Sequence, residues 1–170
     1  MARALIVGCG CRGRELGEKL LAEGWAVRGT SRREEGLVAI EAAGIEPALA
    51  DPDRPGTILE LVNDVAVLVL LLGNASGSEE EQAAIHGPRL ERLMEHLVET
   101  PVRGVLYEGT EEGAGVVEVA GRTWRIPVRT ILPSPLQSPH VGHGDRLAAE
   151  VKALLAGEPK ELNSDTNSGN

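Results

Sequence analysis

Three glycines near the N-terminus have the spacing of a phosphate-binding loop. Gly8, Gly10 and Gly13 form the pattern G-x-G-x-x-G after the apolar run Ala4–Val7 and before a segment that can form a helix. In such a loop the first glycine allows a tight turn, the second lets a pyrophosphate approach the backbone, and the third lets the helix pack against the strand. The free N–H groups and the positive dipole end of the helix then face the phosphates. The pattern predicts a dinucleotide site at Gly8, Cys9, Gly10, Cys11, Arg12 and Gly13.

The residues after the second apolar run, Ala26–Thr30, favour NADP over NAD. They read Ser31-Arg32-Arg33, with no carboxylate before Glu34. A carboxylate at this place binds the ribose 2′-hydroxyl of NAD, whereas an arginine accommodates the 2′-phosphate of NADP, because a guanidinium can bind phosphate bidentately. The alternative is that Arg32 and Arg33 are solvated charges at the start of a helix, where the helix dipole opposes them. We expect NADP as the cofactor and NAD as the less favoured ligand.

Other segments are expected to lie beside the same cofactor. Asp51 ends a short apolar run and is placed either to meet the adenine amino group or to cap the turn before Pro52. Arg12 is expected to add to the binding of either the pyrophosphate or the 2′-phosphate. After the longest β-rich run, the residues expected to pass the ribose are Leu72, Gly73 and Asn74.

Short apolar runs alternate with amphipathic stretches along the chain. Strands are expected at Ala4–Val7, Ala26–Thr30, Pro47–Ala50, Val65–Leu72, Val102–Tyr107 and Pro127–Leu132. Helices are expected at Arg14–Glu23, Glu34–Ala43, Thr57–Val62, Glu79–Glu99 with a break at Gly87-Pro88, Gly115–Arg125 and Asp145–Ala156. The alternation predicts a doubly wound α/β parallel sheet (Rossmann fold) of about six strands, with helices on both faces. We expect a single domain over residues 1–156 and a polar, disordered tail over 157–170.

The composition excludes several classes of partner. A net charge of −9 and a pI near 5.0 argue against nucleic-acid binding, and an aromatic content of 2% leaves few rings for stacking on bases. The longest apolar run, Val65–Leu72, is too short to span a bilayer, and the N-terminal run leads into a glycine turn rather than a signal-peptide cleavage site. We therefore expect a cytoplasmic protein without nucleic-acid or membrane partners. The helix expected at Glu79–Glu99 either mediates a homodimer or covers the sheet.

The chain resembles the atypical and extended short-chain dehydrogenases, which include the NAD-dependent epimerase/dehydratase and NAD(P)H-binding groups. Three similar segments belong to the nucleotide-binding half, and three are similar to the family's fifth strand, its sixth strand and the start of the helix that follows. These segments are Gly8–Gly13, Ser31–Arg33, Ala50–Asp51, Val105–Thr110, Arg125–Pro133 and His143–Ala148. The resemblance implies a Rossmann fold, an NAD(P) cofactor, and Thr110 at the position of the family's catalytic Ser/Thr.

The pair of residues on which that family's chemistry depends is absent from this chain. In the family a tyrosine acts as acid or base, and a lysine one helical turn away lowers its pKa. Here the only tyrosine, Tyr107, lies in an expected strand, and the residue four positions on is Glu111, whose carboxylate would raise the pKa of a phenol. We expect an NADP(H)-binding sensor or binding module. The alternative is an NADPH-dependent reductase of a small carbonyl substrate, in which Thr110, Tyr107 or His140 handles the proton.

The two cysteines could also carry chemistry. Cys9 and Cys11 lie near a helix N-terminus and beside Arg12, conditions that lower the pKa of a thiol. They are therefore either redox-sensing thiols or small residues that fit the glycine loop.

The four histidines do not predict a metal site. His140 and His143 have no cluster of cysteines or carboxylates near them to complete a ligand set, so we expect no metal. They are either incidental loop residues or groups that contact a nicotinamide or a small substrate. His86 and His96 are expected to face solvent from the long polar helix.

Overall fold

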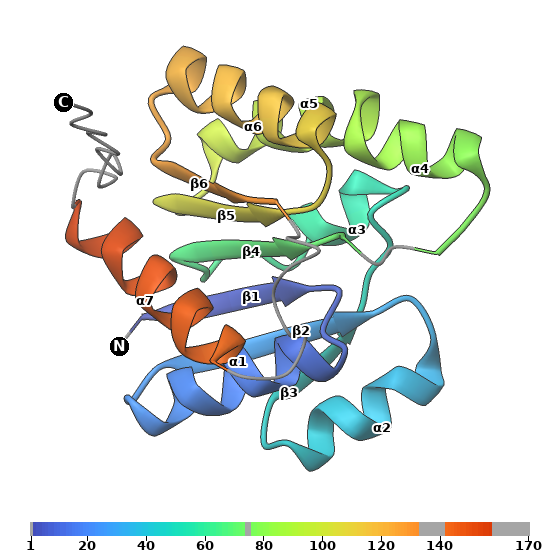
Figure 1. Ribbon diagram of the computed structural model, residues 1–170. Coiled ribbons are helices and arrows are strands. Elements are labelled where there is room, and N and C mark those ends of the chain that lie inside the picture. Colours follow the sequence, from blue (N-terminus) through green and yellow to red (C-terminus); the bar gives the residue numbers. More distant parts are fainter. Residues whose placement is uncertain (1, 74–75, 133–141, 158–170) are drawn as a thin grey trace, which may run out of the picture.

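The computed structural model describes residues 2–73, 76–132 and 142–157 and contains a six-stranded parallel sheet (Figure 1). Its strands are β1 (Arg3–Val7), β2 (Ala26–Ser31), β3 (Glu46–Leu49), β4 (Val67–Leu71), β5 (Gly104–Glu108) and β6 (Val128–Ile131). They lie in the order β3-β2-β1-β4-β5-β6, and every neighbouring pair is parallel. The expected doubly wound Rossmann sheet is confirmed, and its strand order reverses between β1 and β4.

Helices cover both faces of this sheet, as Figure 1 shows. One face carries α1 (Cys11–Ala22), α2 (Glu34–Ala42) and α7 (His143–Ala156). The other carries α3 (Pro55–Leu59), α4 (Glu79–His86), α5 (Pro88–His96), the 3-10 turn η1 (Leu97–Glu99) and α6 (Glu111–Trp124). Each face has its own hydrophobic core, and alternate residues of the strands supply the two cores in turn.

The long helix expected after Ser78 is divided where the sequence predicts. Ser78 forms a capping box with Glu81, and Gly87-Pro88 separates α4 from α5. Leu90, Leu93 and Met94 of α5 are buried against the sheet. The helix pair therefore covers the sheet, and a homodimer through it remains a prediction.

Four helices, α1, α3, α6 and α7, begin earlier than their apolar patterns indicate, and α1 and α6 differ most from the expected starts. α6 begins at Glu111 rather than Gly115, because Thr110 caps it: its hydroxyl oxygen accepts a hydrogen bond of 3.0 Å from the backbone N–H of Gly113. α1 begins at Cys11 rather than Arg14, so that the last part of the glycine loop is already helical. The tail expected at 157–170 lies outside the described residues, apart from Gly157 at the end of α7.

The edge strand β3 contains a proline. The backbone N–H of Ala50 donates to the carbonyl oxygen of Ser31 in β2, so the alternation of the backbone turns the nitrogen of Pro47 away from β2, toward the outer edge. A proline is tolerated at such a place because no hydrogen bond of the sheet is lost there.

Candidate dinucleotide site

The turn after β1 requires its first glycine. Gly8 has a φ of +78°, and a Cβ built on it would lie 2.4 Å from the carbonyl oxygen of Leu71 in β4. Both the backbone conformation and the close approach of the neighbouring strand exclude a side chain. The turn thus brings the loop across the point between β1 and β4 where the strand order reverses, which is where ligands bind in sheets of this kind.

The second glycine, Gly10, stands in a different environment. A Cβ on Gly10 would meet no atom within 4 Å, and its φ of −80° is open to any residue. The fold itself therefore does not require a glycine at this place. The absence of a side chain leaves the backbone accessible from outside, which is what a phosphate in contact with this backbone needs.

The first turn of α1 contains no acidic residue and no side-chain cap. By contrast, α2, α4 and α6 each begin with glutamates. Carboxylates in a first turn interact with the N–H groups and the dipole that would otherwise attract an external anion. Among these four helices, α1 alone combines a glycine turn with an acid-free first turn.

The thiol of Cys9 lies beneath the loop rather than in the site. Its sulfur packs beside Gly29 of β2, where a Cβ would lie 2.7 Å from it, and the side chain belongs to the core under α1. Burial raises the pKa of Cys9 to about 11, with Arg14 opposing the rise. The expected lowering of this pKa is therefore wrong for Cys9, because burial outweighs the helix terminus. Cys11 is exposed, and its sulfur accepts a hydrogen bond from Arg14 at 3.4 Å.

Polar side chains gather on the β2–β3 side of the glycine loop. Nε of Arg32 lies 3.4 Å from Oδ1 of Asp51, and Nη1 of Arg32 donates to the backbone carbonyl of Ser76 at 2.9 Å. One guanidinium thus joins the segments that follow β2, β3 and β4. Arg33 is exposed and makes no hydrogen bond or ion pair through its side chain within the described part of the chain. The hydroxyl of Ser31 accepts from the backbone N–H of Arg33 at 3.1 Å.

The Asp51 carboxylate stabilises the turn that follows β3. Its Oδ1 accepts the backbone N–H of Asp53 at 2.9 Å, in addition to the pairing with Arg32. This is the geometry of the turn-capping alternative, and contact of Asp51 with an adenine stays a prediction. After β4, Leu72 is buried and its N–H donates to the carbonyl of Glu108, Gly73 is exposed, and Asn74 lies outside the described residues.

A second group of polar side chains lies on the β5 side of the loop. Glu108, the last residue of β5, is 1% exposed, and its Oε2 accepts from Nη2 of Arg12 at 2.6 Å. The same oxygen lies 3.0 Å from Nε2 of His143, the first residue of α7, and Arg12 also contacts that nitrogen. Arg12 therefore points away from the Arg32 side of the loop, and its contact with the pyrophosphate or the 2′-phosphate stays a prediction.

Neither Tyr107 nor Thr110 lies in this polar group. The hydroxyl of Tyr107 is buried on the face covered by α4, α5 and α6, where it lies 2.7 Å from Nδ1 of His86 and accepts the N–H of Thr110 at 2.9 Å. Burial raises the pKa of Tyr107, and the hydrogen bonds with Thr110 oppose this rise. The carboxylate that raises the pKa further is Glu112, not Glu111 as expected. Thr110 caps α6. Both side chains thus have structural partners, and a role for either as a proton donor stays a prediction.

His86 does not face solvent, so that expectation is wrong. Its side chain is 4% exposed and packs edge-on against Tyr107, because the last turn of α4 faces the core before Gly87-Pro88 redirects the chain. Burial lowers the pKa of His86, and the charge of Glu112 opposes the change. His140, the remaining candidate, lies outside the described residues, whereas His96 is exposed as expected.

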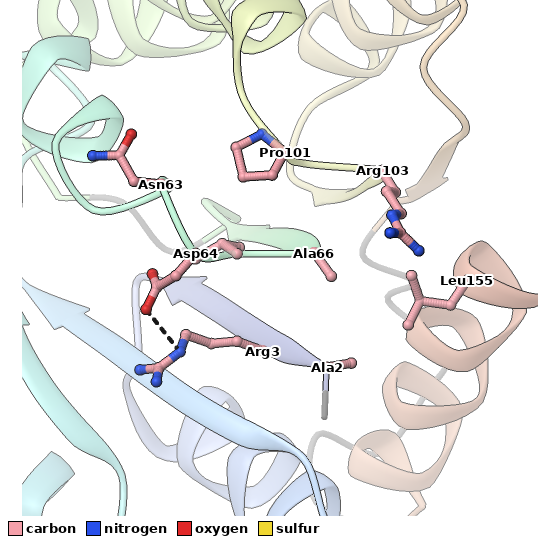
Figure 2. A pocket seen from close by; sticks show the side chains of 9 residues that line it. Ala2, Arg3, Asn63, Asp64, Ala66, Pro101, Arg103 and Leu155 are labelled. Carbon is pink, nitrogen blue, oxygen red and sulfur yellow. Dashed lines mark ion pairs between the residues drawn. The ribbon is translucent and has the colours of Figure 1, made fainter.

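Two surface hollows lie outside the glycine loop. One, of about 390 Å³, opens at the amino ends of β1, β4 and β5; Figure 2 shows the ion pair of Arg3 with Asp64 on one side of it and Arg103 with Leu155 on the other. The other, of about 550 Å³, adjoins the carboxyl end of β6 and is lined by residues of α6, β6 and α7. Only the second lies at the edge where the glycine loop stands.

No group of three or more histidine, cysteine, aspartate or glutamate side chains in the described parts of the chain could hold a metal ion. No helix in those parts of the chain is long and apolar enough to cross a membrane.

Comparisons with known proteins identify the fold. No family model matches the chain, and no curated protein sequence matches it significantly. The structure is similar to a triphenylmethane reductase from Citrobacter sp. in complex with NADP(H), with a TM-score of 0.59, 20% identity, and coverage of 76% of this chain and 48% of the reductase. The chain thus spans about half the length of that enzyme.

Two further similar structures are covered over more of their own length. A putative short-chain dehydrogenase/reductase from Corynebacterium glutamicum gives a TM-score of 0.60 at 22% identity, with 88% of this chain and 89% of that chain covered. A UDP-glucuronic acid 4-epimerase from Bacillus cereus, in complex with NAD, gives 0.61 at 14% identity, with 92% and 64% covered. The fold is therefore that of NAD(P)-binding Rossmann reductases and epimerases, and it occurs with either dinucleotide.

Proposed function

We propose that this chain binds a nicotinamide dinucleotide across the carboxyl edge of its sheet, with the pyrophosphate at the N-terminus of α1. The observation that carries the proposal is the contrast between Gly8 and Gly10. The fold requires a glycine at Gly8, but it leaves room for a side chain at Gly10. A glycine without a role in packing, placed before an acid-free helix N-terminus, fits a loop whose backbone a phosphate approaches.

NADP is the dinucleotide that the β2–β3 side favours. Arg32 and Arg33 follow β2, and no carboxylate stands at the position that binds the 2′-hydroxyl of NAD. Arg33 is exposed, and Arg32 is held over the end of β3 by Asp51 and Ser76. Two guanidinium groups there supply the charge and the bidentate geometry that a 2′-phosphate requires.

Titration of the protein with NADPH and NADH, followed by the fluorescence of the reduced nicotinamide, tests this proposal. We expect tighter binding of NADPH, and Arg32→Ala should weaken NADPH binding by about 10- to 100-fold, the equivalent of about 1.5–3 kcal/mol for a charged hydrogen bond. NADH binding should change little. Arg122→Ala removes an exposed arginine of α6, remote in the fold from the glycine loop, and serves as the control. Equal affinities for the two ligands, unaffected by Arg32→Ala, would refute the 2′-phosphate assignment.

We consider two roles for the bound dinucleotide. The first is a sensor or binding module, which fits the absence of a lysine one helical turn from the only tyrosine. The second is an NADPH-dependent reductase of a small carbonyl substrate, favoured by the buried Glu108 with His143 beside it at the ligand-binding edge. A screen of NADPH consumption over aldehydes, ketones and quinones separates the two, since only the reductase turns the cofactor over.

A further inference from the structure

Nε2 of His143 contacts one hydrogen-bond donor, Arg12, and one acceptor, Glu108, and it cannot satisfy both at once. Nη2 of Arg12 only donates, and Oε2 of the Glu108 carboxylate only accepts. If Nε2 carries no proton it accepts from Arg12. If it carries a proton it donates to Glu108, and the N–H of Arg12 must point elsewhere. The protonation of one nitrogen therefore decides which partner His143 binds.

The buried carboxylate makes this choice energetically important. The Glu108 side chain is 2% exposed, and the Arg12 guanidinium is the cation that pairs with it at 2.6 Å. If Arg12 leaves, Glu108 is a buried charge without a counter-ion, which is costly, unless His143 becomes an imidazolium and takes the place of Arg12. A neutral ring protonated on Nε2 would supply the hydrogen bond but not the charge.

Arg12 also stands where a ligand anion would attract it. It is in the first turn of α1, two residues after Gly10, and its side chain is 29% exposed. The pyrophosphate expected at this helix terminus would offer the guanidinium oxygens with more charge than one carboxylate.

Several other charged groups lie on the elements packed around His143. From α1, Glu15 packs against Gly144, and Lys19 pairs with Asp145 at 2.7 Å. Arg129 of β6 lies 3.5 Å from Glu150 farther along α7. Arg146 belongs to the same first turns of α7 and also makes an interaction, and β4, with the sequence Val-Leu-Val-Leu-Leu, contributes no charge. Arg12 and Glu108 are thus the charged groups whose contacts His143 shares directly.

We propose that dinucleotide binding draws Arg12 from Glu108 to the pyrophosphate and that His143 takes up a proton from solvent to replace it. The hydrogen bond from Arg12 to Nε2 breaks, a proton binds Nε2, and the resulting N–H donates to Oε2 of Glu108. No covalent bond between heavy atoms changes, and charge balances because one proton enters with the ligand. The inference rests on the proposed dinucleotide site and adds a coupling between that site and pH.

Calorimetric titration with NADPH at neutral pH tests the coupling, in two buffers of different ionisation enthalpy. The difference in observed enthalpy between the buffers gives the number of protons exchanged on binding. We expect His143→Gln and Glu108→Gln each to take up fewer protons than the unchanged protein, by up to about one per NADPH. Comparing variants with the same ligand cancels the proton that the 2′-phosphate itself releases when arginines bind it.

His96→Gln is the matched control, because His96 is an exposed histidine at the end of α5 and should leave the proton count unchanged. Far-UV circular dichroism checks that each variant folds, and agreement between two variants on different elements guards against a local defect in either. The same proton count in the unchanged protein, His143→Gln and Glu108→Gln would overturn the coupling while leaving the dinucleotide site intact. Absence of NADPH binding in the unchanged protein would instead refute the proposed function.

Discussion

The hydroxyl oxygen of Tyr107 lies 2.7 Å from Nδ1 of His86, and both side chains are buried. The pair joins β5 to the last turn of α4 on the face opposite Glu108. Because Tyr107 is the only tyrosine of the chain, its phenolate absorbance can be read without interference from other tyrosines.

Tyr107 should titrate above the usual tyrosine range. Burial raises its pKa, so the folded protein should form phenolate only above about pH 10, whereas the unfolded chain should do so near that value. The neutral phenol therefore contributes stability that is present below the unfolded-state pKa and lost as pH rises through the folded-state pKa. Absorbance at alkaline pH, with and without denaturant, measures both titrations. A native titration at or below the denatured one would contradict the buried position.

His86 should lower the free energy of unfolding at acidic pH. Burial lowers its pKa, so its contribution to stability is present above the unfolded-state value of about 6.5 and is lost as pH falls through the folded-state value. Urea denaturation at a series of pH values should show this loss, and it should be smaller in His86→Gln than in the unchanged protein. His96→Gln, at an exposed site, should retain the full loss.

The two cysteines should differ sharply in reactivity. Cys11 is exposed, whereas Cys9 is buried with a pKa of about 11, so a thiol reagent at neutral pH should modify one sulfur per chain rapidly. The second should react only after unfolding, and Cys11→Ser should abolish the rapid phase. Rapid modification of both thiols in the native protein would mean that Cys9 is accessible.

Alanine substitutions at the two glycines should have different effects: Gly8→Ala should lower stability, and Gly10→Ala should weaken NADPH binding. Gly8→Ala places a side chain at positive φ against the Leu71 carbonyl and should cost at least about 1–3 kcal/mol of unfolding free energy. Gly10→Ala meets no neighbour and should change stability by less than about 0.5 kcal/mol, yet weaken NADPH binding at least about tenfold. Denaturation and fluorescence titration measure the two effects. Full affinity in Gly10→Ala would remove the main support for the site.

Asp51→Asn should increase the preference for NADPH. The amide keeps an oxygen for the N–H of Asp53 but removes the charge that pairs with Arg32 at 3.4 Å. The freed guanidinium should bind a 2′-phosphate more strongly, by a few-fold at this partly exposed pair, with little change for NADH. A parallel loss of both affinities would indicate instead that Asp51 contacts the shared adenosine.

The sequence predicts the fold well because its apolar runs are short, separate and bounded by glycines. The apolar run Ala4–Val7 followed by Gly8 predicts a buried strand and a turn. The capping box at Ser78 is also predictable, because its residues are close together in the sequence. Helix starts that depend on a polar cap are harder to predict. Thr110 is an example, because its role as a cap depends on the hydrogen bond that its hydroxyl accepts from the N–H of Gly113 in the folded chain.

The candidate site is predicted less completely, because its ion pairs join distant parts of the chain. Arg12 and Glu108 are 96 residues apart, and no local pattern indicates that they meet. One signal was present: Glu108 follows Val105-Leu106-Tyr107, and a carboxylate ending a buried strand needs a cation. The prediction that His86 faces solvent is wrong because most residues around it in α4 are polar, and they conceal the short segment that turns toward the core.

Pro47 has a consequence for contacts between separate molecules. Exposed strand edges can pair with strands of other chains, and β3 stands at one edge of this sheet. Because the nitrogen of Pro47 faces outward and carries no hydrogen, a foreign strand laid along β3 would lose a hydrogen bond in the middle of a four-residue strand. The proline therefore protects that edge against growth of the sheet into aggregates.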